Sequence, residues 1–385
     1  MSSLPEQIEA RSARDAGAAI VRVEVYAYDL TYAHGSYAMS DGRVLDSLSS
    51  TIVRVVTADG VAGVGEVCPL GTRYLPAFAE GARAALREIA PALIGVDATD
   101  LAAVGDAMDG ALMGHGYAKS PVDIACWDIL GLRTGLPACA LLGGRRADSF
   151  PLYVAVPLAP ADEMARFVRE RMAEGVRRFQ LKLGADPHED AARTAQVASL
   201  ADDDTVIVAD ANCGWLVQDA VVAARLLDGL DRVYLEQPCR TLEECLAVRE
   251  RTTLPMILDE VILDVPTLMR AVHADGLEAF NLKISRVGGL TNARLMRDLA
   301  ERLGLRVTIE DTWGGDVTTA AVAHLAASTR PEHLLTVSFM NDWTREHIAG
   351  YQPRSEHGVG AAPAGPGLGI EVDLDMLGDP VFAIG

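Results

Sequence analysis

The chain contains 385 residues, of which 50% are hydrophobic, and this is enough to bury one large core or two smaller ones. Its formal net charge of −20 at pH 7 excludes nucleic acid and anionic membrane surfaces as expected partners, because both bind basic patches. The N-terminal residues lack the apolar centre of a signal peptide, and no run reaches the roughly 18 apolar residues of a membrane span. We therefore expect a cytoplasmic protein that binds a small molecule and keeps its six cysteines reduced.

The first third of the chain predicts a domain of mixed strands and helices. An alternating apolar run over 20–30 predicts a strand, and residues 50–67 predict a β-hairpin that turns at Asp59 and Gly60. Together these segments predict a small antiparallel sheet.

Helices are expected after this sheet. Apolar residues recur at helical spacing over 78–94 and 101–113. A third helix is predicted to begin with Ser120 as its N-cap and Pro121 in its first turn. Lys119 directly precedes this start, so we interpret it as a structural or surface residue.

The pattern changes near residue 150, from where strands and helices alternate until eight strands have been reached. This order predicts an α/β protein: a modified (β/α)8 barrel whose last helix is replaced, with an N-terminal α+β capping domain. We expect the capping domain over 1–147, completed by a Gly- and Pro-rich segment at about 358–385, and the barrel over 148–357.

Five polar residues stand at the C-terminal ends of predicted barrel strands. The runs FQLK, TVIVAD, VYLE, PMILD and FNLK end in Lys182, Asp210, Glu236, Asp259 and Lys283, 23 to 28 residues apart. Side chains at these ends converge on one mouth of a barrel, so the three carboxylates should meet with a lysine on each flank. Clustered carboxylates repel one another unless they share a cation, and an oxygen-only set suits one Mg²⁺ ion.

The two flanking lysines are unusual in this chain, because lysine accounts for only three of its 34 Lys and Arg residues. Arginine keeps its proton at working pH, whereas a buried lysine can lose its proton and serve as a base. We therefore predict Lys182 and Lys283 as the catalytic residues, with pKa values lowered toward roughly 7–8 by burial and the nearby ion.

The motifs around these residues carry a family resemblance. The segments QLKLG, VADAN, LEQP, LDE and NLKISRVGGLT, in a capped barrel, resemble the enolase superfamily and within it the muconate-lactonizing-enzyme subgroup. The resemblance implies Mg²⁺ held by Asp210, Glu236 and Asp259. It also implies that Lys182 and Lys283 lie on opposite faces of the substrate.

The implied chemistry is removal of the proton α to a carboxylate. The resulting enediolate needs its charge to be met as it forms, which Mg²⁺ on the substrate carboxylate provides. Two lysines on opposite faces of one carbon permit inversion, so we expect an isomerase, either a racemase or an epimerase. Gln180 departs from the subgroup, which often has a lysine at this position. Without that neighbouring cation, the sequence does not show what lowers the pKa of Lys182.

Substrate contacts are expected from the cap loops and the ends of the last two strands. An aromatic wall with nearby carboxylates suits a cationic amine, because cation–π contact contributes roughly 0.5–2 kcal/mol. The predicted substrate-binding residues are Tyr37, Tyr74, Asp311, Trp313, Asp342 and Trp343, with Glu310 and Trp215 on the same side of the barrel.

The cap run EVCPLGTRYLPAFAEGARAAL and the barrel run EDTWGGD narrow the resemblance to enzymes of proline-like amino acids. The first hypothesis is a 2-epimerase or racemase of proline betaine or hydroxyproline betaine. The alternative is a cis-3-hydroxy-L-proline dehydratase, a lyase that expels the β-hydroxyl from the same enediolate. The family commonly forms dimers or octamers, so a homo-oligomer is expected.

Other hypotheses fit less well. Dipeptide epimerases carry an Asp-x-Asp motif at the eighth strand, whereas Asp342 stands alone here. The mandelate-racemase branch is also disfavoured. Its second base is a histidine from strand seven, whereas here a lysine, Lys283, ends strand six. A metal-bound barrel that only binds a ligand has no need of two facing lysines.

Overall fold

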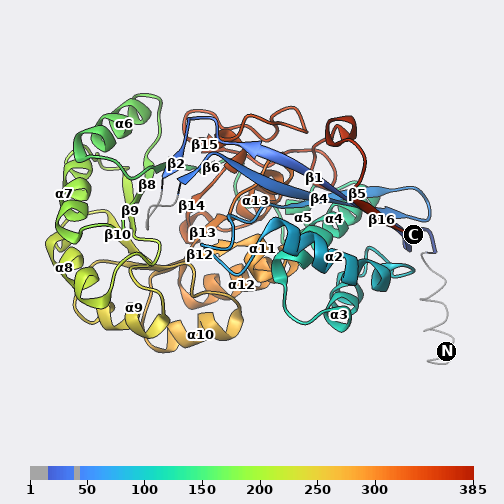
Figure 1. The fold of residues 1–385 in the computed structure, drawn as a ribbon, viewed down its shortest axis with the longest axis horizontal. Coiled ribbons are helices and arrows are strands. Elements are labelled where there is room, and N and C mark those ends of the chain that lie inside the picture. Colours follow the sequence, from blue (N-terminus) through green and yellow to red (C-terminus); the bar gives the residue numbers. More distant parts are fainter. Residues whose placement is uncertain (1–15, 39–43) are drawn as a thin grey trace.

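The computed structural model describes residues 16–38 and 44–385. Residues 1–15, on which the expectation of no signal peptide partly rests, lie outside this part. Figure 1 shows a barrel ringed by helices at one end of the molecule and a smaller domain of strands and helices at the other. Within the described ranges, no helix combines the length and apolar character that crossing a bilayer requires.

The smaller domain is built on a four-stranded antiparallel sheet. Its strands follow the order β16 (Phe382–Ile384), β1 (Ile20–Thr31), β4 (Ser47–Thr57) and β5 (Ala62–Val67). The predicted hairpin is the β4–β5 pair. The last strand of the chain joins the sheet through the pair Val25 and Phe382. A short antiparallel pair, β2 (Tyr37–Ala38) and β3 (Val44–Leu45), lies apart from this sheet.

Four helices follow the sheet strands: α2 (Ala79–Leu93), α3 (Leu101–Ala111), α4 (Gly116–Thr134) and α5 (Ala138–Leu141). The predicted start of α4 at Ser120 was wrong, because the helix begins at Gly116 after a left-handed residue, His115, with φ 53°. Most of α4 is buried, and it packs so closely on β5 that a Cβ on Gly65 would lie 1.9 Å from the Pro121 carbonyl oxygen. Packing thus overrides the local start signal.

Lys119 lies inside α4 as a consequence. Its side chain is 7% exposed and forms an ion pair with Asp109 at 2.6 Å. The interpretation as a structural residue is confirmed, and the alternative of a surface residue was wrong.

Eight parallel strands form the barrel. They are β7 (Tyr153–Val156), β8 (Arg178–Lys182), β9 (Val206–Asp210), β10 (Val233–Glu236), β11 (Met256–Leu258), β12 (Ala279–Lys283), β13 (Arg306–Glu310) and β14 (Leu334–Val337). Each strand pairs with the next one along the chain, and the first and last are joined by a bridge between Leu152 and Val337. The barrel is therefore nearly closed.

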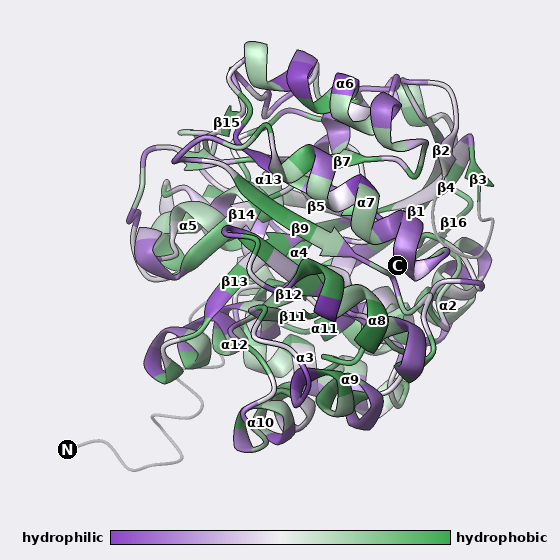
Figure 2. Cartoon of the chain, turned by 90° about the vertical axis from the view of Figure 1, so that its left-hand side faces the viewer, coloured by the Kyte–Doolittle hydropathy of each residue, from purple (hydrophilic) through white to green (hydrophobic). Residues whose placement is uncertain are grey.

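Helices surround these strands: α6 (Ala161–Ala173), α7 (Pro187–Ala198), α8 (Val217–Leu227), α9 (Leu242–Arg249), α10 (Val265–His273), α11 (Ile284–Val287), α12 (Leu290–Leu303) and α13 (Asp316–Ala327). Helix α8, for example, buries Ala220, Ala223, Ala224 and Leu227 at helical spacing, and these residues belong to the same core as the barrel strands. Figure 2 shows the same contrast, with hydrophobic central strands and surrounding helices of mixed character.

Short elements complete the fold: η1 (Ala16–Ala18), β6 (Phe150–Pro151), η3 (Pro331–His333), η4 (Met340–Trp343), β15 (Val359–Gly360) and η5 (Leu374–Leu377). The single-turn helix η4 and an irregular segment follow β14 where a regular barrel would have its last helix. The predicted fold, a modified barrel with an N-terminal cap, is confirmed.

Candidate active site

A narrow cavity of about 30 Å³ lies at the C-terminal ends of the barrel strands, where the cap loops meet the barrel. Its lining includes Lys182, Lys283 and all of the predicted substrate contacts except Asp342. A space of this volume holds about one or two water molecules. The side chains that line the cavity, and not its volume, make it a candidate active site.

The two lysines reach this cavity from opposite sides of the barrel. Lys182 ends β8 and Lys283 ends β12, the second and sixth of the eight strands, and their exposed fractions are only 5% and 6%. Three strands separate them in either direction around the barrel. A substrate carbon placed between them would therefore meet an amine from each face.

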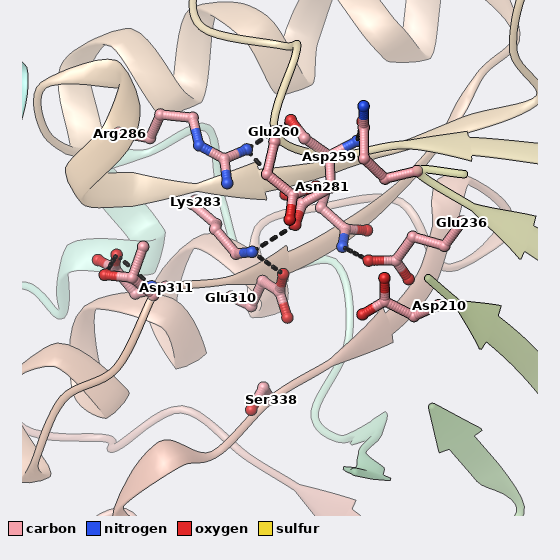
Figure 3. A network of polar contacts seen from close by, with 12 residues as sticks. Asp210, Glu236, Asp259, Glu260, Asn281, Lys283, Arg286, Glu310, Asp311 and Ser338 are labelled. Carbon is pink, nitrogen blue, oxygen red and sulfur yellow. Dashed lines mark hydrogen bonds and ion pairs between the residues drawn. The ribbon is translucent and has the colours of Figure 1, made fainter. Parts of the chain in front are cut away.

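The three predicted carboxylates lie at the ends of the strands between the lysines, and all are at most 1% exposed. Asp210 accepts a hydrogen bond from Lys182 Nζ at 2.5 Å. Asp259 accepts from Lys283 Nζ at 2.6 Å and from Arg286 at 2.7 Å. Figure 3 shows Glu236 and Asp210 close together, with Lys283 between Asp259 and Glu310.

Two neutral amides orient Glu236. Gln180 Nε2 donates to both of its oxygens at 3.1 and 3.0 Å, and Asn281 Nδ2 donates to Oε1 at 2.6 Å. Burial, followed by the charges of Asp210 and Asp259, raises the pKa of Glu236 well above its usual range. Gln180, the departure from the subgroup, therefore acts on a carboxylate and brings no positive charge beside Lys182.

These residues fit a divalent cation by their donor chemistry. The three carboxylates are buried oxygen donors on adjacent strands, which suits a hard ion. Two further buried oxygens beside them, Asn281 Oδ1 and Glu260 Oε2, find no hydrogen-bond partner in residues 16–38 and 44–385. Asp210 and Asp259 are turned toward the lysines, however, and no three His, Cys, Asp or Glu of those ranges already converge as a metal site.

The expectation of a lowered lysine pKa is not met in these contacts. Burial lowers the pKa of Lys182 and Lys283, but the carboxylates of Asp210 and Asp259 raise it, and the net direction is upward for both. A lysine in direct contact with a carboxylate keeps its proton. A free amine at either position thus requires another cation to neutralise the carboxylate.

The aromatic wall that the sequence predicted is present. Ring centroids of Tyr37 and Trp313 lie 5.4 Å apart, and those of Trp313 and Trp343 lie 5.7 Å apart. Tyr153 from β7 joins this group, with its ring 6.0 Å from that of Trp343. Trp313 Nε1 is buried with no hydrogen-bond partner in the described part of the chain, and this N–H is available to a substrate oxygen. Trp215 instead is core, 4% exposed, and its Nε1 donates to the Ala185 carbonyl.

Tyr74 connects the cap to the barrel. Its hydroxyl donates to Asp259 Oδ2 at 3.0 Å and accepts from Lys283 Nζ at 2.7 Å. Burial is the first cause that raises the pKa of Tyr74 well above its usual range, followed by the charge of Asp259. The tyrosine therefore stays a hydroxyl and can keep both contacts.

The two predicted acidic contacts differ in position. Asp311 lines the cavity, and burial raises its pKa to about 6 against the effect of the Ser285 hydroxyl. Asp342 does not line it, which departs from the prediction. Its carboxylate accepts from the Tyr351 hydroxyl at 2.9 Å and borders a separate cavity of about 420 Å³.

Sequence reasoning missed the roles of Tyr153 and Asn281 at this site and gave Gln180 no role in it. A signal was available for the two amides, since Gln180 and Asn281 each precede a predicted catalytic lysine by two residues. Alternate side chains of a strand point to the same face, so all four side chains share the barrel interior. Tyr153 offered no comparable signal.

The fold and these side chains together define a capped barrel enzyme. Family models match the chain as "Enolase C-terminal domain-like" over residues 163–376 and as "Mandelate racemase / muconate lactonizing enzyme, N-terminal domain" over residues 7–143. The chain belongs to the enolase superfamily, in its mandelate racemase/muconate-lactonizing-enzyme group, and the resemblance found in the sequence is confirmed.

Individual relatives span nearly the whole chain. A cis-3-hydroxy-L-proline dehydratase of Roseibium aggregatum is 44% identical and covers 94% of this chain and 98% of its own length. An N-succinyl-L-Arg/Lys racemase of Bacillus cereus is 27% identical over 93% of this chain and 96% of its own. A solved enolase-superfamily member from Roseovarius nubinhibens, complexed with magnesium, is 36% identical with a TM-score of 0.90 over 95% of this chain and 99% of its own.

Proposed function

We propose that this chain removes the proton α to the carboxylate of a small proline-like amino acid and then expels a hydroxyl from the β-carbon, as a cis-3-hydroxy-L-proline dehydratase. The observation that carries the proposal is the pair Lys182 and Lys283, buried at the ends of opposite barrel strands in one narrow cavity. The 44% identity to a dehydratase, over nearly the full length of both chains, supports dehydration over the epimerisation that the sequence motifs first favoured.

The carboxylates of Asp210, Glu236 and Asp259 would hold one Mg²⁺ ion. When bound, such an ion polarises the substrate carboxylate and stabilises the charge that develops on its oxygens. Gln180 and Asn281 hold Glu236 in place through neutral amides, so they orient this carboxylate without adding charge. The aromatic wall excludes bulk water from the reacting carbon.

The lysines carry the protons of the reaction. One lysine, as the free amine, takes the α-proton, and the electron pair of the C–H bond then forms a double bond between the α- and β-carbons. The bond from the β-carbon to its hydroxyl breaks, and that oxygen takes a proton and leaves as water. The lysine on the opposite face, as an ammonium group, is a proton donor within the same cavity.

Epimerisation of proline betaine or hydroxyproline betaine is the second candidate. The wall formed by Tyr37, Trp313 and Trp343 favours it, because aromatic faces attract a quaternary ammonium group. Among the relatives, the N-succinyl-L-Arg/Lys racemase and a D-Ala-D/L-Ala epimerase, at 27% and 28% identity, carry out reactions of this class.

The test is incubation of the purified chain and Mg²⁺ with cis-3-hydroxy-L-proline and, separately, with proline betaine in D₂O. Dehydration predicts that the product of cis-3-hydroxy-L-proline has lost one water. Epimerisation predicts that both stereoisomers of the substrate carry deuterium on the α-carbon and that no water is lost. Mass spectrometry and chiral chromatography separate these results. The absence of both water loss and α-deuterium with either compound would refute the proposed function.

A further inference from the structure

Glu310 is a buried carboxylate in the cavity that neither the lysine pair nor the three candidate metal ligands account for. It ends β13, is 1% exposed and lines the same cavity as Lys283. The backbone of Glu310 pairs with that of Lys283 on the neighbouring strand, and Glu310 Oε1 lies 3.2 Å from Lys283 Nζ. Its other oxygen accepts a hydrogen bond from the Tyr153 hydroxyl.

Asp311 is the other carboxylate that lines the cavity, and its oxygens are already used. Oδ1 accepts from the Ser285 hydroxyl and from the Thr312 amide at 2.7 Å, while Oδ2 accepts from the Ser285 amide at 3.0 Å. These donors fix Asp311 to the backbone after β12. Glu310 is held by side chains alone and is the carboxylate better placed to meet a ligand.

The surroundings of Glu310 match the chemistry of a cationic nitrogen. Its partner Tyr153 packs edge-on against Trp343, with ring centroids 6.0 Å apart, and Trp343 in turn contacts Trp313. A carboxylate beside aromatic rings in a narrow, buried cavity attracts an ammonium group through both its charge and the ring quadrupoles. The carboxylate and the wall thus form one subsite.

The position of this subsite beside Lys283 indicates which substrate atom it can contact. A lysine that exchanges the α-proton must approach the α-carbon, and in an amino acid the nitrogen is bonded directly to that carbon. A group that lies 3.2 Å from Lys283 Nζ is therefore within reach of the nitrogen of the same substrate.

We propose that Glu310, and neither Asp311 nor Asp342, is the specificity-determining residue that binds the substrate's ammonium nitrogen beside Lys283. The inference rests on the proposed function, since it assumes that the substrate is an α-amino carboxylate. It selects amino acids over hydroxy acids and other carboxylates of the same shape.

The experiment compares two ligands that differ only in the ring atom, L-proline and (S)-tetrahydrofuran-2-carboxylate. Calorimetric titration of the full-length chain with Mg²⁺ is expected to show that the wild type prefers proline by roughly 30-fold or more, as loss of one partner of a buried charge pair does. Glu310→Gln is expected to remove this preference while the oxygen analogue still binds. Because the two ligands share every other contact, the ratio cancels effects of the substitution on Lys283.

Two further variants make the result specific. Glu310→Asp keeps the charge and is expected to restore part of the preference, and it also replaces Glu310→Gln should that variant not fold. Asp342→Asn, a carboxylate outside the cavity, is expected to keep the full preference. Equal weakening of both ligands by Glu310→Gln, an unchanged preference in that variant, or no preference in the wild type would each overturn the inference.

The results that would refute the proposed function differ from those that would refute the role of Glu310. A wild type that neither dehydrates cis-3-hydroxy-L-proline nor exchanges the α-hydrogen of any proline derivative refutes the function itself. A wild type that catalyses either reaction, but whose Glu310→Gln variant still discriminates between the ligand pair, refutes the role of Glu310 alone.

Discussion

Lys182 and Lys283 end barrel strands that face each other across the cavity, and each contacts a different carboxylate, Asp210 at 2.5 Å and Asp259 at 2.6 Å. The two halves of the site are therefore alike: a lysine paired with a candidate metal ligand on either side of Glu236. A substrate carbon between them has access to a proton acceptor on one face and a proton donor on the other.

Replacement of either lysine is expected to lower kcat by roughly 10²–10⁴-fold, the contribution of a positioned acid or base. Lys182→Ala and Lys283→Ala should differ in α-deuterium exchange, because only the variant that keeps the proton-abstracting lysine can still exchange. Steady-state turnover and mass spectrometry in D₂O measure the two effects. Lys119→Arg, which alters the remaining lysine of the chain at its ion pair with Asp109, is the control and should keep wild-type turnover. Wild-type turnover in both alanine variants would refute the two-lysine mechanism.

The strand-end residues were predictable because the spacing of βα units brings the C-terminal ends of parallel strands to one mouth. The contacts of these residues were not. Which oxygen Lys182 or Lys283 meets depends on rotamers and on side chains from neighbouring strands, so the direction of their pKa shifts could not be read from spacing. The position of Glu310 at the end of its strand could be predicted from the sequence. Its contact with Tyr153, which is distant in the sequence, could not.

Local signals misled the prediction where packing decides. Ser120 and Pro121 form a typical helix start, yet α4 extends back to Gly116, which packs closely against the backbone of Arg286 and Gly288. Asp342 was grouped with Trp343 by its neighbouring position. The η4 turn separates them, since only the indole of Trp343 faces the cavity.

Metal binding is expected to stabilise the chain through the three carboxylates. Titration with Mg²⁺ should raise the melting temperature, with about 2.7 kcal/mol of added stability at a free concentration one hundred times Kd. Glu236→Gln removes a charged donor and should abolish this shift without loss of the fold, because the Gln180 amide and the new amide can still meet by rotation. Scanning calorimetry with and without EDTA measures the effect. An identical Mg²⁺ shift in wild type and Glu236→Gln would exclude these residues as the ion's ligands.

Removal of the Tyr74 hydroxyl is expected to impair catalysis more than stability. Tyr74→Phe loses the contacts with Lys283 Nζ and Asp259 Oδ2, so the lysine is held less firmly and kcat should fall by roughly 5- to 100-fold. Tyr117→Phe, on the cap helix α4 and outside the cavity, is the matched control. Steady-state kinetics give the comparison. Equal kcat values for the two variants would show that the cap does not position Lys283 through Tyr74.

A buried histidine is expected to make the stability of the fold depend on pH. His324 on α13 is fully buried, accepts a hydrogen bond from the Cys139 amide through Nδ1, and faces the Leu368 carbonyl with Nε2 at 2.9 Å. Both ring nitrogens are thus satisfied in the neutral tautomer that carries its proton on Nε2. A second proton on Nδ1 would oppose the Cys139 N–H.

Burial, partly offset by the Leu368 hydrogen bond, lowers the pKa of His324 from 6.5 to about 4. The unfolded chain therefore binds a proton at higher pH than the folded chain does. Stability from this residue is complete above pH 6.5 and is lost as the pH falls toward 4, by about 3 kcal/mol in total. Asp123 has the opposite sign, because burial raises its pKa to about 6 and its contribution is lost as the pH rises through that value.

Comparison of His324→Gln with the wild type isolates the histidine, since both chains share Asp123 and the other titrating groups. The free energy of unfolding in urea, measured from pH 4.5 to 7.5, should show a difference between the two that is largest at neutral pH and shrinks as the pH falls. The variant should also be less stable at pH 7.5, because glutamine cannot satisfy both the Cys139 amide and the Leu368 carbonyl in the ring's geometry. A difference that stays constant across this pH range would mean that His324 takes up its proton as readily in the folded chain as in the unfolded one.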